Sequence, residues 1–394
     1  MDRVKQAIIL AAGEGQRLKP FTALKPKVML PIANKPILQY VIEALATNGV
    51  FQVVIVVGYR KEQVQDYFGS GERFGVDISY VVQEQQLGTG HALRQAKDMA
   101  EGRFMVLSGD NIIEPDTLSS FLEADAGAVL LKEQKNTSKY GVATVKDGLV
   151  SDIAEKPEKA ESFLVNTGIY LFNRQVFSFL EEEVDLVQAL KEGLKVGYRL
   201  LAAQTPGRWL DVVYPWDILV LNDRTLKMLS PSRGGRTEAG VAINGPVTVG
   251  KGTIIRSHTY IVGPVIIGEN CEIGPSVCLL PSTSLGKGVV VSPFSLIENS
   301  VINSSVEVGP NSTIVDSIID YGCIFKGNFM AHSGESEVKI EGEYHSVKMG
   351  AMVGEYCKVG EGVSIQPGRS LGTHCQVGPG KVISTDIPGS GLVV

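Results

Sequence analysis

A hexapeptide repeat occupies most of the second half of the chain and restricts its fold more than any other feature. An aliphatic residue recurs every six positions, without a miss, at Val249, Ile255, Ile261, Ile267, Ile273, Leu279, Leu285, Val291 and Ile297. A helix repeats about every 3.6 residues and an ordinary strand every two, so a period of six indicates short strands wound into coils, with the aliphatic side chain pointing inward. With three hexads in each coil, residues 241–394 are expected to form a left-handed parallel β-helix.

The repeat slips by one residue after Ile297 and then continues toward the end of the chain. Its later members are Ile302, Val308, Ile314, Val353, Val359, Ile365, Leu371, Val377 and Ile383. The segment near residues 326–348 breaks the period, and we expect it to project from the coils as a loop.

The first half of the chain, residues 1–229, has the pattern of an α/β domain. Short runs rich in Val, Ile and Leu, such as AIILAAG, VVIVVG and FMVLSGD, alternate with helical patterns such as PILQYVIEALATNG. This alternation predicts a doubly wound, mostly parallel sheet covered by helices on both faces. After about residue 126 the pattern loosens into a mixed insertion with hairpin-like glycine turns, and a helix follows near residues 214–228. The polar, glycine-rich segment 230–240 is predicted to be a linker.

Composition excludes several classes of protein. The formal net charge of −6 argues against a nucleic-acid-binding protein, whose surface would be basic. Five scattered cysteines without CxxC spacing indicate neither a zinc site nor a disulfide framework, so we expect them to be core residues in a reducing compartment. No apolar stretch reaches about 18 residues, and the first strand pattern begins at Ala7, which leaves no room for the two regions of a signal peptide, so we expect none. We therefore expect a cytoplasmic enzyme that contacts neither nucleic acid nor a membrane.

The loop that follows the first predicted strand combines glycines with positive charge. Gly13 and Gly15 have the first spacing of a dinucleotide-binding fingerprint, but Leu18 replaces its third glycine and prolines obstruct the required helix. The Walker A pattern is also absent. The remaining interpretation is a loop whose glycine backbone N–H groups can closely approach anionic oxygens. This loop is flanked by Arg17, Lys19, Lys25 and Lys27. Such a loop is suited to a nucleoside triphosphate, whose charge must be neutralised as pyrophosphate leaves.

The stretch GEGQRLKPFTALKPK resembles the signature loop of sugar-1-phosphate nucleotidylyltransferases. The resemblance implies that Arg17 and Lys27 are catalytic, with Lys25 the weaker choice for the lysine. It also implies that the loop and the strand before it bind the nucleotide, through Leu10, Ala12, Gly13 and Gly15.

A second motif, QEQQLGTGHAL, is similar to the stretch that reads uracil in bacterial N-acetylglucosamine-1-phosphate uridylyltransferases. The amide of Gln83 can donate to and accept from a pyrimidine edge, and Gly88 permits close approach. Thr89 is expected to begin a helix, and Gln86 lies in the same motif. The alternative interpretation is that QEQQ is ordinary polar surface that leads to the N-cap of a helix.

Two aspartates match the magnesium positions of the family. Asp110 ends the strand pattern LSGD, at the edge of the sheet where α/β enzymes bind ligands. Asp211 lies in WLD, a form that resembles the thymidylyltransferases more than the uridylyltransferases. Two hard oxygen ligands suit Mg²⁺ that also contacts phosphates.

Three further motifs resemble the family's sugar-binding elements, namely YG, EKP and NTG. The resemblance implies backbone contact at Gly141, hydroxyl contacts from Glu155 and Asn166, and a phosphate contact from Lys156. The reaction implied is in-line attack of a sugar-1-phosphate oxygen on the α-phosphorus of the triphosphate. That oxygen is already anionic, so positioning and charge stabilisation are sufficient without a general base.

Along nearly its whole length the chain resembles the archaeal bifunctional sugar-1-phosphate nucleotidylyltransferase/acetyltransferase family. In that family the β-helix trimerises, and a histidine acts as base for acetyl transfer from acetyl-CoA between neighbouring prisms. Here Pro310 stands at the histidine position and Thr313 at a tyrosine position. His332 or His345, with Lys348 nearby, could supply a base in the interrupting segment. Otherwise the β-helix serves assembly alone.

The substrates implied first are UTP and N-acetylglucosamine-1-phosphate, because QEQQLGTGHAL matches the uridylyl branch. Glucose-1-phosphate with dTTP or UTP is the alternative, supported by Asp211 in WLD. A catalytically silent sensor or scaffold is an alternative from another class of protein. The presence of Arg17, Lys27, Asp110 and Asp211 opposes it, because such a protein could lose any of these residues. A pure acyltransferase is opposed by Pro310.

Overall fold

The computed structural model describes residues 4–135, 137, 139–155, 157, 162–181 and 183–394. The chain divides into two compact units. The first unit consists of residues up to Glu14, Lys25–Met29 and Pro36–Asp211, and the second consists of Gly15–Leu24, Leu30–Lys35 and Val212–Val394. The short segments near the start of the chain therefore alternate between the two units.

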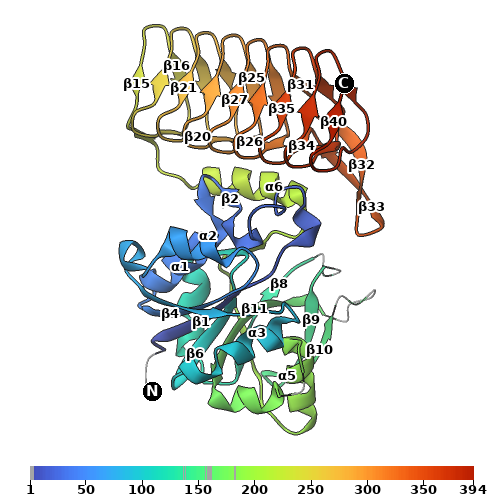
Figure 1. Cartoon of the computed structure of the whole chain (residues 1–394). Helices are drawn as coiled ribbons and strands as arrows, with labels where there is room; N and C mark the ends of the chain where they lie inside the picture. Colours follow the sequence, from blue (N-terminus) through green and yellow to red (C-terminus); the bar gives the residue numbers. More distant parts are fainter. Residues whose placement is uncertain (1–3, 136, 138, 156, 158–161, 182) are drawn as a thin grey trace. The chain divides into compact units, whose positions relative to one another are not determined.

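The first unit is built on a mixed sheet of nine strands among the described residues (Figure 1). Their order is β5-β4-β1-β6-β11-β8-β12-β10-β9. These strands are β1 (Gln6–Ala11), β4 (Gln52–Val57), β5 (Asp77–Val82), β6 (Arg103–Ser108), β8 (Ala128–Glu133), β9 (Gly141–Lys146), β10 (Leu149–Glu155), β11 (Leu164–Asn173) and β12 (Leu201–Gln204). A separate two-stranded sheet pairs β7 (Asn111–Ile113) with β13 (Trp209–Asp211).

The strands β5, β4, β1 and β6 are parallel to one another, as their continuous apolar runs predict. The pattern changes at β11, which is antiparallel to β6 and β8. Strands β9 and β10 form an antiparallel pair, and β12 is parallel to β8. The predicted mixed insertion after residue 126 therefore extends the same sheet.

Two hydrophobic cores lie on the opposite faces of this sheet, because side chains alternate along each strand. On β1, Ala7, Ile9 and Ala11 belong to one core and Ile8 to the other. Residues of α1 and α2 join the first core, and residues of α3 and α5 join the second. The helices of this unit are α1 (Ile37–Thr47), α2 (Lys61–Phe68), α3 (Thr89–Gln95), α4 (Pro115–Ser119) and α5 (Leu186–Lys195). The doubly wound architecture is confirmed.

The second unit contains three stacked parallel sheets, the arrangement expected of a left-handed β-helix (Figure 1). One sheet consists of β14 (Ser232–Arg233), β17 (Val247–Val249), β20 (Val265–Ile267), β23 (Thr283–Leu285), β26 (Val301–Ile302), β29 (Ile318–Ile319), β34 (Met352–Val353) and β37 (Ser370–Leu371). The next consists of β15 (Arg236–Thr237), β18 (Ile254–Ile255), β21 (Glu272–Ile273), β24 (Val290–Val291), β27 (Glu307–Val308), β30 (Ile324–Phe325), β35 (Lys358–Val359), β38 (Gln376–Val377) and β40 (Leu392–Val393). The third consists of β16 (Ala242–Asn244), β19 (Tyr260–Val262), β22 (Cys278–Leu279), β25 (Leu296–Glu298), β28 (Thr313–Val315), β31 (Met330–Ala331), β36 (Ser364–Ile365) and β39 (Val382–Ile383).

Every aliphatic residue of the predicted repeat is buried in the single core of the β-helix. Ile319, Phe325 and Ala331 continue the inward row through the part where the sequence pattern was less clear. Four of the five cysteines, all except Cys278, are also buried there. The segment 230–240, predicted as a linker, contains β14 and β15, which pair with β17 and β18.

The segment that interrupts the repeat forms an antiparallel hairpin, β32 (Gly334–Ile340) and β33 (Glu343–Met349), which projects from the coils (Figure 1). The projection begins later than residue 326, because β31 still pairs with β28 and β36.

Helix α6 (Pro215–Leu226) packs beside β23 in the same unit. Its buried Asn222 accepts from the Ser284 hydroxyl at 2.6 Å and donates to the Ser282 carbonyl at 2.9 Å. None of the helices in the described residues is long and apolar enough to cross a membrane.

We predict that Val291→Ala lowers the free energy of unfolding of the β-helix by about 2 kcal/mol, since it removes buried methyl groups and leaves a cavity. Val290→Ala is the matched control, because Val290 is 36% exposed whereas Val291 is fully buried. That control should change stability by less than about 0.5 kcal/mol. Urea denaturation followed by circular dichroism measures both, and equal losses would contradict the inward orientation of the repeat.

Candidate active site

Lys27 lies between two carboxylates in the first unit. Its ammonium donates to Asp110 Oδ2 at 2.5 Å and lies 3.7 Å from Asp211 Oδ1. The three side chains are only 16–25% exposed. Lys27 begins a short 3-10 helix, Lys27–Met29, directly after Pro26. Two residues predicted as metal ligands and one predicted as catalytic therefore meet at one point.

Asp110 is positioned by the end of β6. The Gly109 amide donates to the Leu10 carbonyl at 2.9 Å, which continues the β1–β6 pairing beyond the strand. A Cβ on Gly109 would lie 3.1 Å from Ala11 Cβ and 3.2 Å from Val28 Cγ1, so glycine allows close packing here. The Ser108 hydroxyl donates to Asp110 Oδ1 at 2.5 Å and fixes the carboxylate.

Asp211 is positioned by β13, whose register with β7 sets it opposite Asn111. The Asn111 amide donates to Asp211 Oδ1 at 3.3 Å. The Asn111 side-chain oxygen is buried without a hydrogen-bond partner in the described structure. Sequence reasoning missed Asn111 and Ser108 as supporting residues. Their only signal was their position beside Asp110 in LSGDN, which does not reveal the pairing with a strand about a hundred residues later.

The positive charge of Lys27 and the negative charges of the two aspartates attract each other. Burial alone would lower the pKa of Lys27, but the charges of Asp110 and Asp211 outweigh it and raise that pKa above its usual value. Burial alone would raise the pKa of Asp110, but the Lys27 charge, together with hydrogen bonds from Lys27 and Ser108, lowers it. Both groups are therefore ionised at neutral pH.

The residues around Lys27 fit a magnesium ion that is completed by substrate and water. No cluster of three or more His, Cys, Asp or Glu that could hold a metal occurs among the residues described. Mg²⁺, however, is commonly held by one or two carboxylates together with phosphates and several waters. Asp110 and Asp211 supply such a pair, and the unpartnered oxygen of Asn111 is a further hard donor beside them.

The glycine loop is divided between the units, with Gly13 in the first and Gly15 and Arg17 in the second. A Cβ on Gly13 would meet nothing within 4 Å, so the backbone there faces open space. Gly15 has a left-handed conformation, with φ of 76°, and caps the 3-10 helix Gln16–Leu18. Arg17 donates from Nε to Glu341 Oε2 at 2.6 Å. Its predicted convergence with Lys27 on one triphosphate stays a prediction.

Some of the residues predicted to bind the nucleotide lie together. A Cβ on Gly58 would lie 2.7 Å from Gln86 Nε2 and 2.9 Å from Ala12 Cβ, so Ala12 and Gln86 flank the same glycine. Leu10, on β1, is paired with Ser108 of β6 and connects this region to Asp110.

Gln83 follows β5, Gly88 is the residue directly before α3, and Thr89 begins that helix. Gln83 is buried, and its Nε2 donates to the Gly88 carbonyl at 3.1 Å and lies 2.9 Å from His91 Nδ1. Gly88 has φ of 146° and approaches the Val184 carbonyl too closely for a side chain. The Thr89 hydroxyl accepts from the Leu186 amide at 3.0 Å. The amide of Gln83 thus supports this turn in the described structure.

Three of the residues predicted to bind the sugar are brought together. A Cβ on Gly141 would lie 3.0 Å from Glu155 Oε2 and 3.8 Å from Asn166 Cβ. The Asn166 amide donates to the Tyr170 hydroxyl at 2.6 Å. Lys156, predicted to contact the sugar phosphate, lies outside the described residues.

The candidates for acetyl transfer lie on or near the projecting hairpin. The His345 ring packs against Tyr214 and Trp216, with centroids 4.6 and 5.4 Å apart. Lys348 is exposed, as is His332, which precedes the hairpin. Their role in acetyl transfer stays a prediction.

Comparison with known proteins shows the family of this chain. Residues 6–227 match the family described as nucleotidyl transferase. The bifunctional protein GlmU of Methanococcus maripaludis is 36% identical over 371 residues, which cover 90% of this chain and 88% of that protein. The glucose-1-phosphate thymidylyltransferase of Streptomyces antibioticus is 32% identical over 333 residues, which cover 77% of this chain and 93% of that protein.

A solved structure of UDP-glucose pyrophosphorylase complexed with UDP-glucose is also similar. It is 28% identical, with a TM-score of 0.51 over 57% of this chain and 99% of that one. A family match across more than half of the chain, and relatives that align along most of its length, show that this protein belongs to the nucleotidyl transferase family.

Proposed function

We propose that the protein transfers a nucleotidyl group from a nucleoside triphosphate to a sugar-1-phosphate and releases pyrophosphate. The observation that carries the proposal is the Lys27 ammonium held between Asp110 and Asp211 at the end of β6. The matched nucleotidyl transferase family and the relatives named GlmU and glucose-1-phosphate thymidylyltransferase support it.

In the proposed reaction an oxygen of the sugar-1-phosphate attacks the α-phosphorus, and the bond from that phosphorus to the bridging oxygen breaks. Lys27 turns from Asp110 toward the phosphates and offsets the negative charge that grows on the leaving group. Arg17 binds the triphosphate from the glycine loop. Asp110 and Asp211 would hold Mg²⁺, which supplies charge neutralisation and orientation of the phosphates. The sugar phosphate oxygen is already anionic, so no residue needs to remove a proton.

We propose UTP and N-acetylglucosamine-1-phosphate as the substrates. Support comes from the motif around Gln83 and Gly88 and from the similarity to GlmU. The second candidate pair is dTTP and glucose-1-phosphate, favoured by Asp211 in the WLD strand and by the similarity to a thymidylyltransferase. Uracil and thymine differ by one methyl group, which a pocket distinguishes by only about 1–3 kcal/mol. Either base could therefore be accepted.

A pyrophosphate-release panel tests the proposal, crossing four nucleoside triphosphates with glucose-, N-acetylglucosamine- and mannose-1-phosphate. We expect release with UTP and N-acetylglucosamine-1-phosphate that stops when EDTA removes Mg²⁺. Lys27→Ala and Asp110→Asn should each lower kcat by about 10²- to 10³-fold, because each removes a charge that the transition state requires.

Lys25→Ala is the matched control for Lys27→Ala, since it removes a lysine of the same loop. It should keep most of the activity, and circular dichroism should show all three variants folded. Wild-type turnover in Lys27→Ala or Asp110→Asn would contradict the assignment of the site.

We further propose that the β-helix does not carry out acetyl transfer in the manner implied for the bifunctional family. Pro310 lies where a basic histidine is expected, and proline cannot accept a proton. With acetyl-CoA and glucosamine-1-phosphate we therefore predict no release of free thiol above background. Robust release would contradict this prediction, and its loss in His332→Ala, His345→Ala or Lys348→Ala would identify the group responsible.

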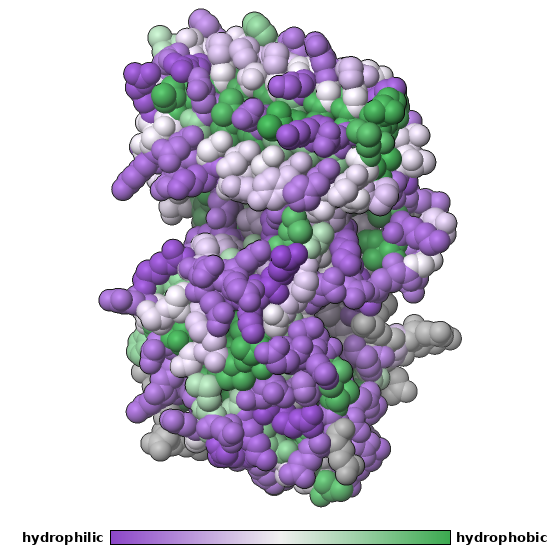
Figure 2. Space-filling view, viewed as in Figure 1, coloured by the Kyte–Doolittle hydropathy of each residue, from purple (hydrophilic) through white to green (hydrophobic). Residues whose placement is uncertain are grey.

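We also propose that the β-helix mediates self-association. Large apolar side chains are exposed along its strands, and the face seen in Figure 2 carries apolar patches among polar ones. The exposed apolar side chains of the β-helix include Tyr260, Met330, Val382 and Leu392. Light scattering after size exclusion should give three times the chain mass of 42.3 kDa. A single-chain mass at micromolar concentration would contradict a stable assembly.

A further inference from the structure

The tip of the projecting hairpin presents a glutamate in an unusual backbone conformation. The last paired residues of β32 and β33 are Ile340 and Glu343, which leaves Glu341 and Gly342 as a two-residue turn. Both have positive φ, 49° and 92°, as a type I′ turn requires. Asparagine, aspartate or glycine is usual at the first of these positions, because longer side chains disfavour this conformation. The turn itself therefore does not explain why a glutamate is present.

The contact made by Glu341 does explain it. Its carboxylate accepts from Arg17 Nε at 2.6 Å, and both residues belong to the second unit. The hydrogen bond from Arg17 to Glu341 is the main reason that the pKa of Arg17 is raised; partial burial opposes the shift, and the negative charges of Glu341 and Glu343 add to it. The hairpin thus places a negative charge on the arginine that the proposed function assigns to the triphosphate.

The part of the signature loop that carries Arg17, Gly15–Leu24, belongs to the same unit as the hairpin. Leu18, Phe21 and Thr22 are buried, and the Thr22 hydroxyl donates to the Gly15 carbonyl at 2.7 Å. A Cβ on Gly354 of the β-helix would lie 3.1 Å from the Pro20 side chain. Because the loop around Arg17 is held this way, contact with Glu341 can be broken by moving the hairpin tip without rebuilding the loop.

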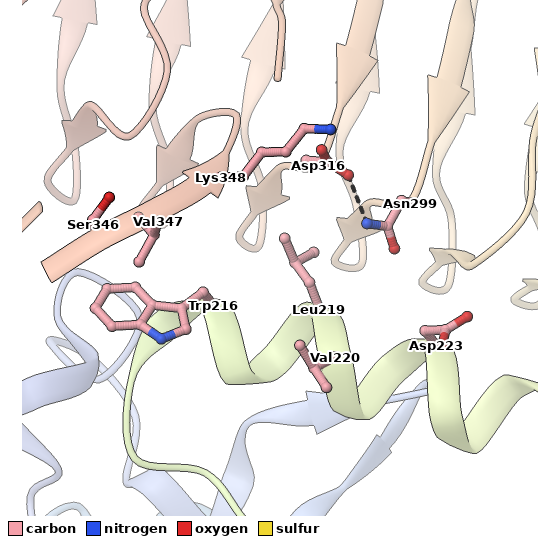
Figure 3. Close-up of a pocket in the computed structure, with 9 residues that line it drawn as sticks. All are labelled: Trp216, Leu219, Val220, Asp223, Asn299, Asp316, Ser346, Val347 and Lys348. Carbon is pink, nitrogen blue, oxygen red and sulfur yellow. Dashed lines mark hydrogen bonds between the residues drawn. The ribbon is translucent and has the colours of Figure 1, made fainter. Parts of the chain in front are cut away.

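The hairpin is held firmly at its base and loosely toward its tip. His345 packs on Tyr214 and Trp216, and the Arg369 guanidinium donates to the Ser336 hydroxyl and the Glu337 carbonyl, both at 2.9 Å. A cavity of about 590 Å³ lies between α6 and the base of β33, so this part of the hairpin is held by the contacts of His345 and Arg369 and not by continuous packing on α6 (Figure 3). Its lining includes Trp216, Leu219 and Val220 on α6 and Ser346, Val347 and Lys348 on β33. Residues 341–344 are exposed. Few packed contacts would be lost if the tip moved.

Resting on the proposed function, we propose that Glu341 competes with the nucleoside triphosphate for Arg17, so that the triphosphate reaches this arginine only after the hairpin carboxylate has been displaced. Glu341 thereby sets the affinity for the nucleotide. It does not touch the reacting atoms, so it should affect the nucleotide KM and leave kcat unchanged. If Glu341 instead oriented Arg17 for catalysis, its removal would lower kcat and leave the nucleotide KM unchanged.

The test is Glu341→Gln in the full-length protein, which removes the charge and keeps the size of the side chain. The Arg17–Glu341 pair is 39% and 49% exposed, so its contribution is that of a surface ion pair. We expect the dissociation constant for UTP with Mg²⁺, measured by titration calorimetry, to fall about two- to fivefold. The KM for UTP should fall by the same factor. Glu337→Gln, the same change at an exposed position on β32, is the matched control and should alter neither value.

Hydrogen exchange provides a second readout that does not depend on turnover. UTP with Mg²⁺ should increase amide exchange at the hairpin tip, residues 339–344, and leave the base of the hairpin unchanged. An unchanged or weaker UTP affinity in Glu341→Gln, or protection of the tip by UTP, would overturn the proposal. If the wild-type protein turns over UTP and Glu341→Gln has the same dissociation constant and KM for UTP as the wild type, only this inference fails. If the wild type neither binds nor turns over any of the four triphosphates, the proposed function fails, and this inference with it.

Discussion

The proposed active site of this protein depends on one cation held between two carboxylates. Lys27, Asp110 and Asp211 come from three separate parts of the chain and meet in a partly buried site, where the ammonium offsets the charge of both carboxylates. Leaving any one of them unpaired would be costly, because a buried charge without a partner loses its hydration and gains nothing in return. The fold therefore maintains a site in which positive and negative charge are already close, as phosphoryl chemistry demands. In the proposed reaction, the triphosphate would replace Asp110 as the partner of Lys27, and Mg²⁺ would replace Lys27 as the partner of the two carboxylates.

The sheet explains why these groups meet. Asp110 follows β6 where parallel strands end, and this edge is where ligands bind in open α/β sheets. The β7–β13 pair brings Asp211 back to the same edge from about a hundred residues further along the chain. Gly109 allows the strand end to approach Val28, next to Lys27. The pairing and packing of the backbone thus set the positions of Asp110, Asp211 and Lys27.

Much of this could be predicted from the sequence, and the exceptions have a common cause. The inward row of the β-helix depends only on local period, and its members are buried as expected. The parallel strands and the positions of Asp110 and Lys27 follow from apolar runs and motif order. In contrast, Asn111 supports Asp211 through a strand register, and Arg17 meets Glu341 across 324 residues. Neither pairing leaves a periodic signal, because each depends on how distant segments are brought together. The projecting segment was likewise expected to begin near residue 326, which is too early. Ala331 is smaller than the aliphatic residues of the repeat and hides the period, although β31 still pairs with β28.

The most direct measurement is a crystal structure with a non-hydrolysable UTP analogue and Mn²⁺ in place of Mg²⁺, since manganese can be located by its anomalous scattering. The account predicts an anomalous peak coordinated by Asp110 and Asp211, with the Lys27 ammonium within hydrogen-bonding distance of a phosphate oxygen. Nucleotide bound away from both aspartates, with Lys27 still paired to Asp110, would contradict it.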